Sequence, residues 1–222
     1  MGILRAFFNN TRKPEGLLGR CMVGSMNRAH AALADWGLSY LPETGPAEIA
    51  ELGCGGGRNI QALLQKYPAA TVTALDYSEI SVEKARSVNR KGLQAGRCRI
   101  IQGDVSCLPF ENGAFDLATA FETVYFWPGP TKSFREVYRT LRPGGAFLIV
   151  NESDGEDPQA GKWLSVIDGM RIFDGDQLAC FLTEAGFSEV IVERNAKKHW
   201  LCVLAMRENS SLLENEEPGG IS

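Results

Sequence analysis

The chain has 222 residues, of which 44% are hydrophobic and 23% are charged, and its formal net charge is −4. This length suits one α/β domain around a single core, and no apolar stretch approaches the ~20 residues that a helix needs to span a bilayer, so we expect no membrane association. The acidic balance, without a stripe of lysines and arginines, argues against a nucleic-acid substrate.

The amino-terminal region predicts one amphipathic helix. Residues 1–8 are apolar only briefly, which does not fit a signal peptide, so we expect a cytoplasmic protein. From Glu15 to Leu41, apolar side chains recur near one helical face. Pro42 and Pro46 then interrupt the chain ahead of the first strand.

The most informative segment is a glycine-rich turn between an apolar strand at 47–52 and a helix that starts near Asn59. Every second position from 53 to 57 is glycine, which lets the backbone turn tightly and lets a ligand approach the main chain at the first turn of the helix. A dinucleotide fingerprint would need a third glycine where this chain has Arg58. Arg58 itself could pair with Glu51, contact a ligand carboxylate or face solvent.

Two acidic residues follow the next two predicted strands. The β-rich run 71–76 ends in Asp76, at the carboxyl end of a strand, where open α/β sheets bind their ligands. After a predicted helix at 78–94, the strand 97–103 repeats this layout and leads to Asp104. Both carboxylates are therefore expected at the same edge of the sheet as the glycine-rich turn.

The second half of the chain continues the alternation of strands and helices. We expect a strand at 114–121, a helix at 131–141, a strand at 144–151 and a helix at 175–185. Asp116, at the start of a strand, is interpreted as structural. Right-handed crossovers would make the sheet largely parallel.

The last part of the chain departs from this pattern. The segment 151–174 is acidic and rich in turns, with a short helix marked by Trp163, and we expect it as an insertion on the ligand side of the sheet. Two β-rich runs, 188–193 and 199–206, are separated by a short connection that suits an antiparallel hairpin. Residues 208–222 are polar and are predicted to be a disordered tail.

The glycine-rich turn and the ordered blocks 71–76, 99–105, 114–121 and 141–150 resemble the motifs of the class I S-adenosylmethionine-dependent methyltransferases. The layout is most similar to the small-molecule branch that includes the ubiquinone and menaquinone C-methyltransferases. This resemblance implies an α/β, Rossmann-like fold with a seven-stranded, mostly parallel sheet, an antiparallel last strand and flanking helices. The domains would be a lid-helix region at 1–45 and the S-adenosylmethionine-binding domain at 46–207.

The resemblance also implies a set of cofactor-binding residues. Asp76 would accept hydrogen bonds from both ribose hydroxyls, and Asp104 would read the adenine amino group beside the Val105 N–H. S-adenosylmethionine would be the cofactor and S-adenosylhomocysteine the product. The full expected set is Glu51, Gly53, Cys54, Gly55, Gly57, Asp76, Tyr77, Asp104, Val105 and Phe121.

The expected chemistry is methyl transfer to a small-molecule acceptor by in-line displacement, without a metal. The electrophile is already activated, so the protein mainly aligns the acceptor and excludes water. A base is needed where the acceptor loses a proton, and Glu122 and Tyr125 are the first candidates; capping and aromatic packing are their alternatives. The lid helix and the insertion would contact the acceptor, with these candidate residues: Met22, Asn27, His30, Trp127, Asn151 and Trp163.

Other interpretations stay open at this point. The chain could be a regulatory protein that binds S-adenosylmethionine without catalysis, a methyltransferase acting on RNA or protein, or a nicotinamide-dependent oxidoreductase. The six cysteines have no C-x-x-C pairs, so they are expected as reduced core thiols and not as metal ligands, although Cys54 in the glycine-rich turn could be reactive. We expect a monomer or a homodimer.

Overall fold

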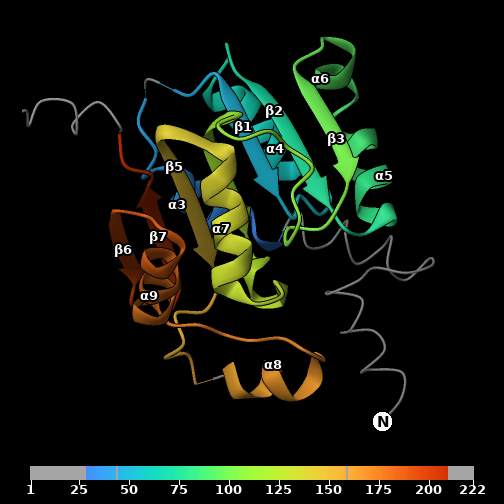
Figure 1. The fold of residues 1–222 in the computed structure, drawn as a ribbon. Coiled ribbons are helices and arrows are strands. Elements are labelled where there is room, and N and C mark those ends of the chain that lie inside the picture. Colours follow the sequence, from blue (N-terminus) through green and yellow to red (C-terminus); the bar gives the residue numbers. More distant parts are fainter. Residues whose placement is uncertain (1–28, 44, 159, 210–222) are drawn as a thin grey trace, which may run out of the picture.

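The computed structural model describes residues 29–43, 45–158 and 160–209 (Figure 1). One seven-stranded sheet has the strand order β3-β2-β1-β4-β5-β7-β6. The strands are β1 Glu48–Leu52, β2 Thr71–Asp76, β3 Cys98–Gln102, β4 Phe115–Phe121, β5 Leu141–Asn151, β6 Glu189–Asn195 and β7 Trp200–Met206. The helices are α3 Ala31–Leu38, α4 Arg58–Lys66, α5 Glu79–Val88, α6 Arg90–Gln94, the 3₁₀ turn η1 Val124–Phe126, α7 Pro130–Thr140, α8 Ala160–Val166 and α9 Gly175–Ala185.

The pairing of the strands confirms the predicted fold class. Strands β3, β2, β1, β4 and β5 pair in parallel, whereas β7 runs antiparallel to both β5 and β6. The strand order reverses between β1 and β4, so their carboxyl ends form the kind of crevice in which open α/β sheets bind ligands.

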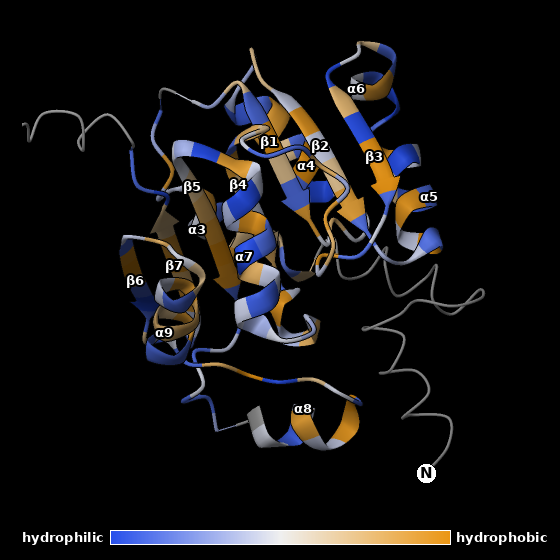
Figure 2. Cartoon of the chain, in the orientation of Figure 1, coloured by the Kyte–Doolittle hydropathy of each residue, from blue (hydrophilic) through white to orange (hydrophobic). Residues whose placement is uncertain are grey.

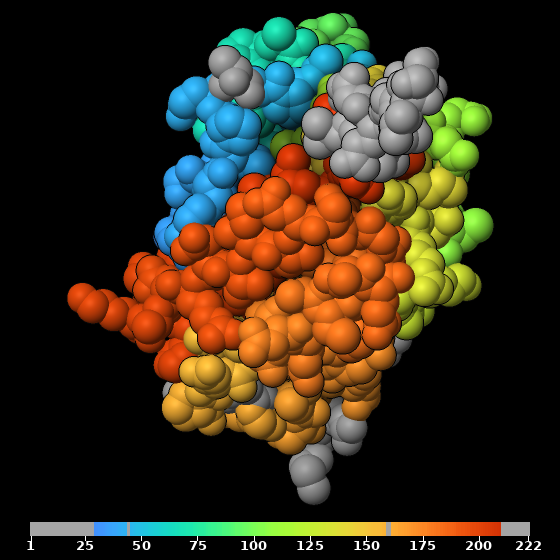
Figure 3. Space-filling model, turned by 60° about the vertical axis from the view of Figure 1, so that its left-hand side comes forward, coloured from blue at the N-terminus to red at the C-terminus, as the bar shows by residue number. Residues whose placement is uncertain are grey.

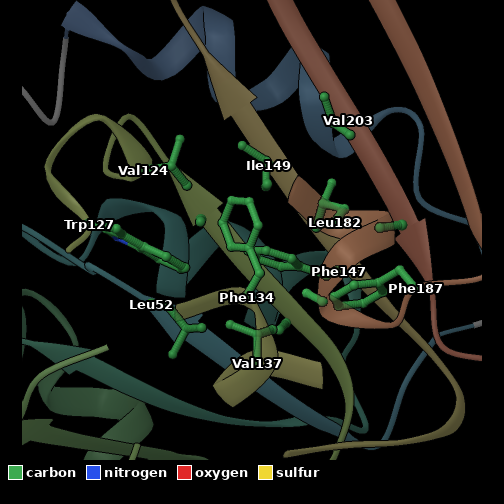
Figure 4. Close-up of a cluster of buried hydrophobic side chains, with 14 of the residues drawn as sticks. Leu52, Val124, Trp127, Phe134, Val137, Phe147, Ile149, Leu182, Phe187 and Val203 are labelled. Carbon is green, nitrogen blue, oxygen red and sulfur yellow. The ribbon is translucent and has the colours of Figure 1, made fainter. Parts of the chain in front are cut away.

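Helices cover both faces of the sheet, and the hydrophobic residues concentrate in the strands between them (Figure 2). On one face, α3, α4 and α5 bury apolar residues such as Leu33, Ile60 and Val82. On the other face, α7 and α9 pack Phe134 and Leu182 against Phe147 and its neighbours (Figure 4). Burial of these side chains on both faces is the main favourable term in the stability of the fold.

Several boundaries differ from those that the sequence predicts. The single helix expected at 78–94 divides into α5 and α6, because the Asn89 side chain donates hydrogen bonds to the carbonyls of Gly57 and Ala85 at the point of division. Strand β5 begins at Leu141, three residues earlier than expected. Of the long amino-terminal helix, the described residues include only α3, and residues 210–222 of the expected tail lie outside them.

Two of the predicted carboxyl-terminal elements are present in the structure. The hairpin of β6 and β7 is present, and α9 matches its predicted bounds with a capping box between Asp174 and Gln177 and a left-handed Gly186 at its end. In Figure 1, α8 lies beyond the carboxyl ends of the parallel strands. Figure 3 shows that the segments from α8 to β7 cover one side of the molecule. No helix among the described residues is long and apolar enough to cross a membrane.

Asp116 ties three segments together at the amino-terminal end of β4, as the structural interpretation expects. Its Oδ2 accepts hydrogen bonds from the N–H groups of Ala47 and Glu48 at 2.9 Å, and its Oδ1 accepts one from Arg142 at 2.6 Å. Burial alone would raise the pKa of Asp116, but the hydrogen bonds of the Glu48 N–H, Arg142 and the Ala47 N–H outweigh it and lower the pKa below its usual value of 3.8.

We expect Asp116→Ala to lower the free energy of unfolding by about 2 kcal/mol, because two backbone donors and one guanidinium lose their acceptor. The lowered pKa means that this contribution is fully present above the unfolded-state pKa and is lost as pH falls through the folded-state pKa. Urea unfolding at pH 7 and pH 3 measures both effects. Equal losses for the alanine variant at the two pH values would contradict the ionised role of Asp116.

Candidate functional site

A pocket opens at the carboxyl ends of the central strands. It encloses about 650 Å³, including space open to solvent. Strands β1 and β2, the loop after β3 and the segment after β4 all contribute to it. The lining residues are Gly53, Leu75, Asp76, Tyr77, Gly103, Asp104, Val105, Thr123, Phe126, Trp127 and Pro128.

Asp76 is the most strongly anchored side chain of this pocket. It is 6% exposed, and its two oxygens accept hydrogen bonds from the N–H groups of Gly55 at 2.8 Å and Ser78 at 2.9 Å. Burial raises the pKa of Asp76 against the lowering effect of these hydrogen bonds. Each oxygen keeps a further lone pair, so the carboxylate can accept hydrogen bonds from two ligand hydroxyls.

The glycine-rich turn is shaped so that a ligand can approach it. The N–H groups of Gly53 and Cys54 both donate to the Leu75 carbonyl, which holds the turn against β2. Gly53, Gly55 and Gly57 have positive φ values of 80°, 49° and 80°. At Gly55 the place of a side chain is open, with no atom within 4 Å. This open cradle beside the Asp76 carboxylate fits the ribose and methionine parts of S-adenosylmethionine.

The two glycines give a matched pair of variants. At Gly53 an added Cβ would lie 2.2 Å from the Thr123 Oγ1, whereas at Gly55 it would meet nothing. We expect Gly53→Ala to lower the melting temperature by several degrees and to abolish binding of S-adenosylhomocysteine. We expect Gly55→Ala to cost only about 1 kcal/mol of backbone strain, yet to weaken binding about tenfold or more because its methyl group occupies the cradle. Differential scanning fluorimetry and calorimetric titration separate the two effects; unchanged binding by Gly55→Ala would rule out the cradle.

Five residues of the expected cofactor set are not among those that line the pocket: Glu51, Cys54, Gly55, Gly57 and Phe121. Glu51 is 1% exposed and accepts a hydrogen bond from the Thr119 hydroxyl, and burial raises its pKa to about 8. Its Oε1 has no partner among the described residues. Phe121 is packed in the core beneath the site, and so is Cys54, whose thiol has a pKa raised by burial; this argues against a reactive thiolate.

Glu122 lies directly after β4, next to the pocket residue Thr123, in a left-handed backbone conformation with φ 58°. Its side chain is 12% exposed. Its Oε1 accepts hydrogen bonds from the Tyr125 hydroxyl at 3.1 Å and from the N–H of Glu152. Positive φ is uncommon for a residue with a side chain and is concentrated at functional sites.

Burial raises the pKa of Glu122 to about 7, although the charge of His30 acts in the opposite direction. The same burial raises the pKa of Tyr125 well above its usual value of 10. At neutral pH the tyrosine is therefore a hydrogen-bond donor, while the glutamate can gain or lose a proton. Sequence patterns single out both residues but do not reveal that they contact each other.

Of the remaining residues predicted to contact the acceptor, Trp127 lines the pocket, whereas Asn151 and Trp163 do not. Trp127 lines the pocket, donates its indole N–H to Thr123 and stacks on Phe147 in the core. Asn151 is fully buried in β5, away from the pocket lining, and its side-chain amide has no partner among the described residues. Trp163 is 36% exposed on α8. Met22 and Asn27 lie outside the described residues.

Arg58 pairs with a residue that the sequence did not indicate, and not with Glu51. Its guanidinium pairs with Asp35 of α3 at 2.5 Å, so it links α3 to the start of α4.

Pocket residues that the motifs did not indicate are Leu75, Gly103, Thr123, Phe126 and Pro128. Most directly follow or precede predicted site residues in the sequence, and this adjacency is the signal by which they could have been found. Of the five described cysteines, Cys107 and Cys180 are exposed, which corrects the expectation of core thiols for these two.

Comparison with known proteins relates the chain to methyltransferases. Residues 50–149 match the family model described as a methyltransferase domain. An uncharacterized methyltransferase of Bacillus subtilis, YdaC, is 26% identical over 181 residues, which cover 81% of this chain and 93% of the relative. The 2-methyl-6-phytyl-1,4-hydroquinone methyltransferase of spinach is 31% identical over 102 residues, covering 46% of this chain and 28% of the relative. The chain spans about a third or less of the length of several curated relatives that it matches.

Solved structures share the fold. The chain solved in complex with the Trm112 methyltransferase activator of Haloferax volcanii has a TM-score of 0.78 at 18% identity, covering 93% of this chain and 98% of that one. A SAM-dependent methyltransferase of Thermotoga maritima has a TM-score of 0.66 at 20% identity, covering 82% and 91%. The family match confirms the predicted enzyme class at the level of the domain, and the solved structures share its fold.

Proposed function

We propose that the whole protein transfers a methyl group from S-adenosylmethionine to a small-molecule acceptor that loses a proton in the reaction. The methyltransferase domain matched at residues 50–149 supports this proposal. The observation that carries this proposal is a buried carboxylate, Glu122, one residue from the cofactor pocket. When bound, S-adenosylmethionine supplies a methyl group already activated by its sulfonium. The residues of the chain must therefore bind the cofactor, align the acceptor with the methyl group and remove the acceptor's proton.

In this proposal the two pocket carboxylates bind and orient the cofactor. Asp76 would accept hydrogen bonds from the ribose hydroxyls and would still accept those from the N–H groups of Gly55 and Ser78. These hydrogen bonds would hold the glycine-rich turn around the ligand. Asp104, whose Oδ1 accepts the Ser106 N–H at 2.8 Å, faces the same pocket and would read the adenine. The Cα of Gly55, with open space beside it, allows the close approach that the methionine part needs.

Glu122 is the proposed general base, and Tyr125 is the residue that orients it. The Tyr125 hydroxyl accepts the N–H of Ser153 at 3.2 Å, so its own proton is directed to Glu122. A base with a pKa near the working pH is well suited to proton removal in the transition state. No step in this scheme calls for a metal, since the electrophile is activated by its own charge.

Support for a small-molecule acceptor comes from the relatives and from the pocket. The spinach relative is named for a hydroquinone acceptor, and the aromatic residues Phe126, Trp127 and Tyr77 line the same pocket as the two carboxylates. The Trm112-bound structure keeps open the alternative of a methyltransferase that works with an activator protein. A regulatory protein without catalysis is the other alternative.

The test is release of S-adenosylhomocysteine from S-adenosylmethionine in the presence of a panel of phenols, hydroquinones and amines. Turnover that depends on one acceptor class would support the proposal. Binding of S-adenosylhomocysteine without turnover on any acceptor, with or without added activator protein, would favour the regulatory alternative. Gly55→Ala is the control variant, because turnover that this variant does not reduce would have to occur outside the pocket.

A further inference from the structure

Three side chains from distant parts of the sequence meet beside the cofactor pocket. His30 directly precedes α3, Glu122 follows β4 and Glu152 follows β5. The His30 Nε2 lies 3.3 Å from the Glu152 Oε2 and 4.0 Å from the Glu122 Oε2. The imidazole thus stands between the two carboxylates.

The hydrogen bonds around Glu122 assign different roles to its two oxygens. Oε1 accepts from two donors, the Tyr125 hydroxyl and the Glu152 N–H. Oε2 is the oxygen nearer to His30. Because donors stabilise negative charge on Oε1, a proton taken up by Glu122 goes to Oε2 and faces the imidazole.

Exposure rises in one direction through the cluster. The exposed fraction of the side chain is 12% for Glu122, 27% for His30 and 60% for Glu152. The buried carboxylate therefore has the imidazole as its neighbour on the side toward solvent, and the imidazole in turn has an exposed carboxylate. The 4.0 Å distance exceeds a hydrogen bond by about 1 Å, so a proton passes between the Glu122 Oε2 and the His30 Nε2 only after a small movement of one side chain.

We propose that His30 and Glu152 form the route by which Glu122 returns its proton to solvent, so that the three side chains work as a proton relay. This rests on the proposed function. In each turnover the acceptor forms a bond to the methyl carbon, the carbon–sulfur bond breaks with its electron pair left on sulfur, and the acceptor's N–H or O–H proton passes to the Glu122 Oε2. His30 gives its Nε2 proton to water beside Glu152 and then takes the proton of Glu122. The acceptor class that needs this route has an N–H or O–H at the methylated atom.

The charges in the cluster are consistent with proton sharing. The titratable groups that face Glu122 are His30, Glu152 and Tyr125. Burial lowers the pKa of His30, but the hydrogen bond to Glu152 and the charges of both glutamates outweigh it and raise the pKa above 6.5. The hydrogen bond to His30 lowers the pKa of Glu152. The pKa values of both His30 and Glu122 are raised, and the 4.0 Å between the His30 Nε2 and the Glu122 Oε2 makes them two interacting groups between which a proton can pass.

The chain has two histidines, so NMR can follow the His30 ring without a ligand. His199→Gln, which removes a histidine paired with Asp154, assigns the resonances and is the matched control. In a pH titration, we expect the chemical shift of the His30 ring to show two inflections in the wild type, one from His30 itself and one from Glu122. The inflection from Glu122 should be lost in Glu122→Gln. In Glu152→Gln the midpoint of the His30 titration should fall by about 0.5 to 1 pH unit. A single inflection that is unchanged in Glu122→Gln would overturn the relay.

A second measurement separates a relay from a static ion pair. With an acceptor found in the screen, we expect His30→Ala to lower kcat about tenfold at pH 7, with partial recovery in added imidazole. A merely structural contact would lower the melting temperature or the affinity for S-adenosylhomocysteine and would not respond to imidazole; that result would overturn the relay. Calorimetric titration of the wild type with S-adenosylhomocysteine is independent of the NMR and kinetic tests of the relay. If the wild type does not bind S-adenosylhomocysteine, the proposed function is wrong, whatever the relay tests show.

Discussion

Replacement of Asp76 by alanine is expected to abolish measurable binding of S-adenosylhomocysteine. The wild type should bind at micromolar concentration, about −8 kcal/mol. The variant loses two charge-assisted hydrogen bonds to the ribose, each worth about 1.5 to 3 kcal/mol, so a loss of affinity of 100-fold or more follows. The N–H groups of Gly55 and Ser78 also lose their acceptor, which loosens the glycine-rich turn.

Two control variants make the Asp76 experiment specific. Asp76→Asn keeps one acceptor oxygen without the charge, and we expect its affinity to lie between those of the wild type and the alanine variant. Asp176→Ala removes a carboxylate whose side chain is 96% exposed on α9, and its affinity should equal that of the wild type. Calorimetric titration measures all three. Wild-type affinity in Asp76→Ala would show that the ribose is bound elsewhere.

Glu122→Gln is expected to lower kcat by a factor of 10² to 10⁴, the usual loss when a general base is removed. The amide keeps an oxygen that can accept from Tyr125 and from the Glu152 N–H, so the fold and the affinity for S-adenosylhomocysteine should change little. Glu189→Gln, on the edge strand β6, is the matched control. An unchanged kcat in Glu122→Gln would mean that the acceptor's proton leaves directly to water.

The pH dependence gives a second test of Glu122. Its pKa is raised from 4.5 to about 7, so the base is ionised above pH 7 and kcat/KM should rise with pH through that value. Stability runs in the opposite direction. The contribution of the protonated group is fully present below pH 4.5 and is lost as pH rises through about 7. In Glu122→Gln, kcat/KM should lose its rise near pH 7, which a pH–rate profile would check. The free energy of unfolding should lose the part of its pH dependence that Glu122 contributes, which chemical denaturation at pH 5 and pH 8 would check.

The cofactor pocket could be predicted from the sequence because its residues belong to local motifs. A glycine-rich turn between a strand and a helix fixes its own shape, and an acid at the end of a parallel strand must lie at the same edge of the sheet. Gly53, Asp76 and Asp104 therefore line the pocket as expected. Glu51 belongs to the same motif, but it faces the Thr119 hydroxyl in the interior, because alternate residues of a strand point to opposite faces and the pocket lies beyond the strand end.

The meeting of His30, Glu122 and Glu152 could not be predicted in the same way. The three residues are far apart in the sequence, and no local pattern joins them. Their contact depends on how α3 packs against β5, where the Val150 side chain lies against Gly37. The division of α5 from α6 likewise depends on a hydrogen bond from Asn89 to Gly57, 32 residues away. The sequence by itself determined the order of the elements and the cofactor-binding turn, since these follow from local backbone chemistry. Only the tertiary structure decided which side chains surround Glu122 beside the pocket, since burial and long-range contacts set their position and charge.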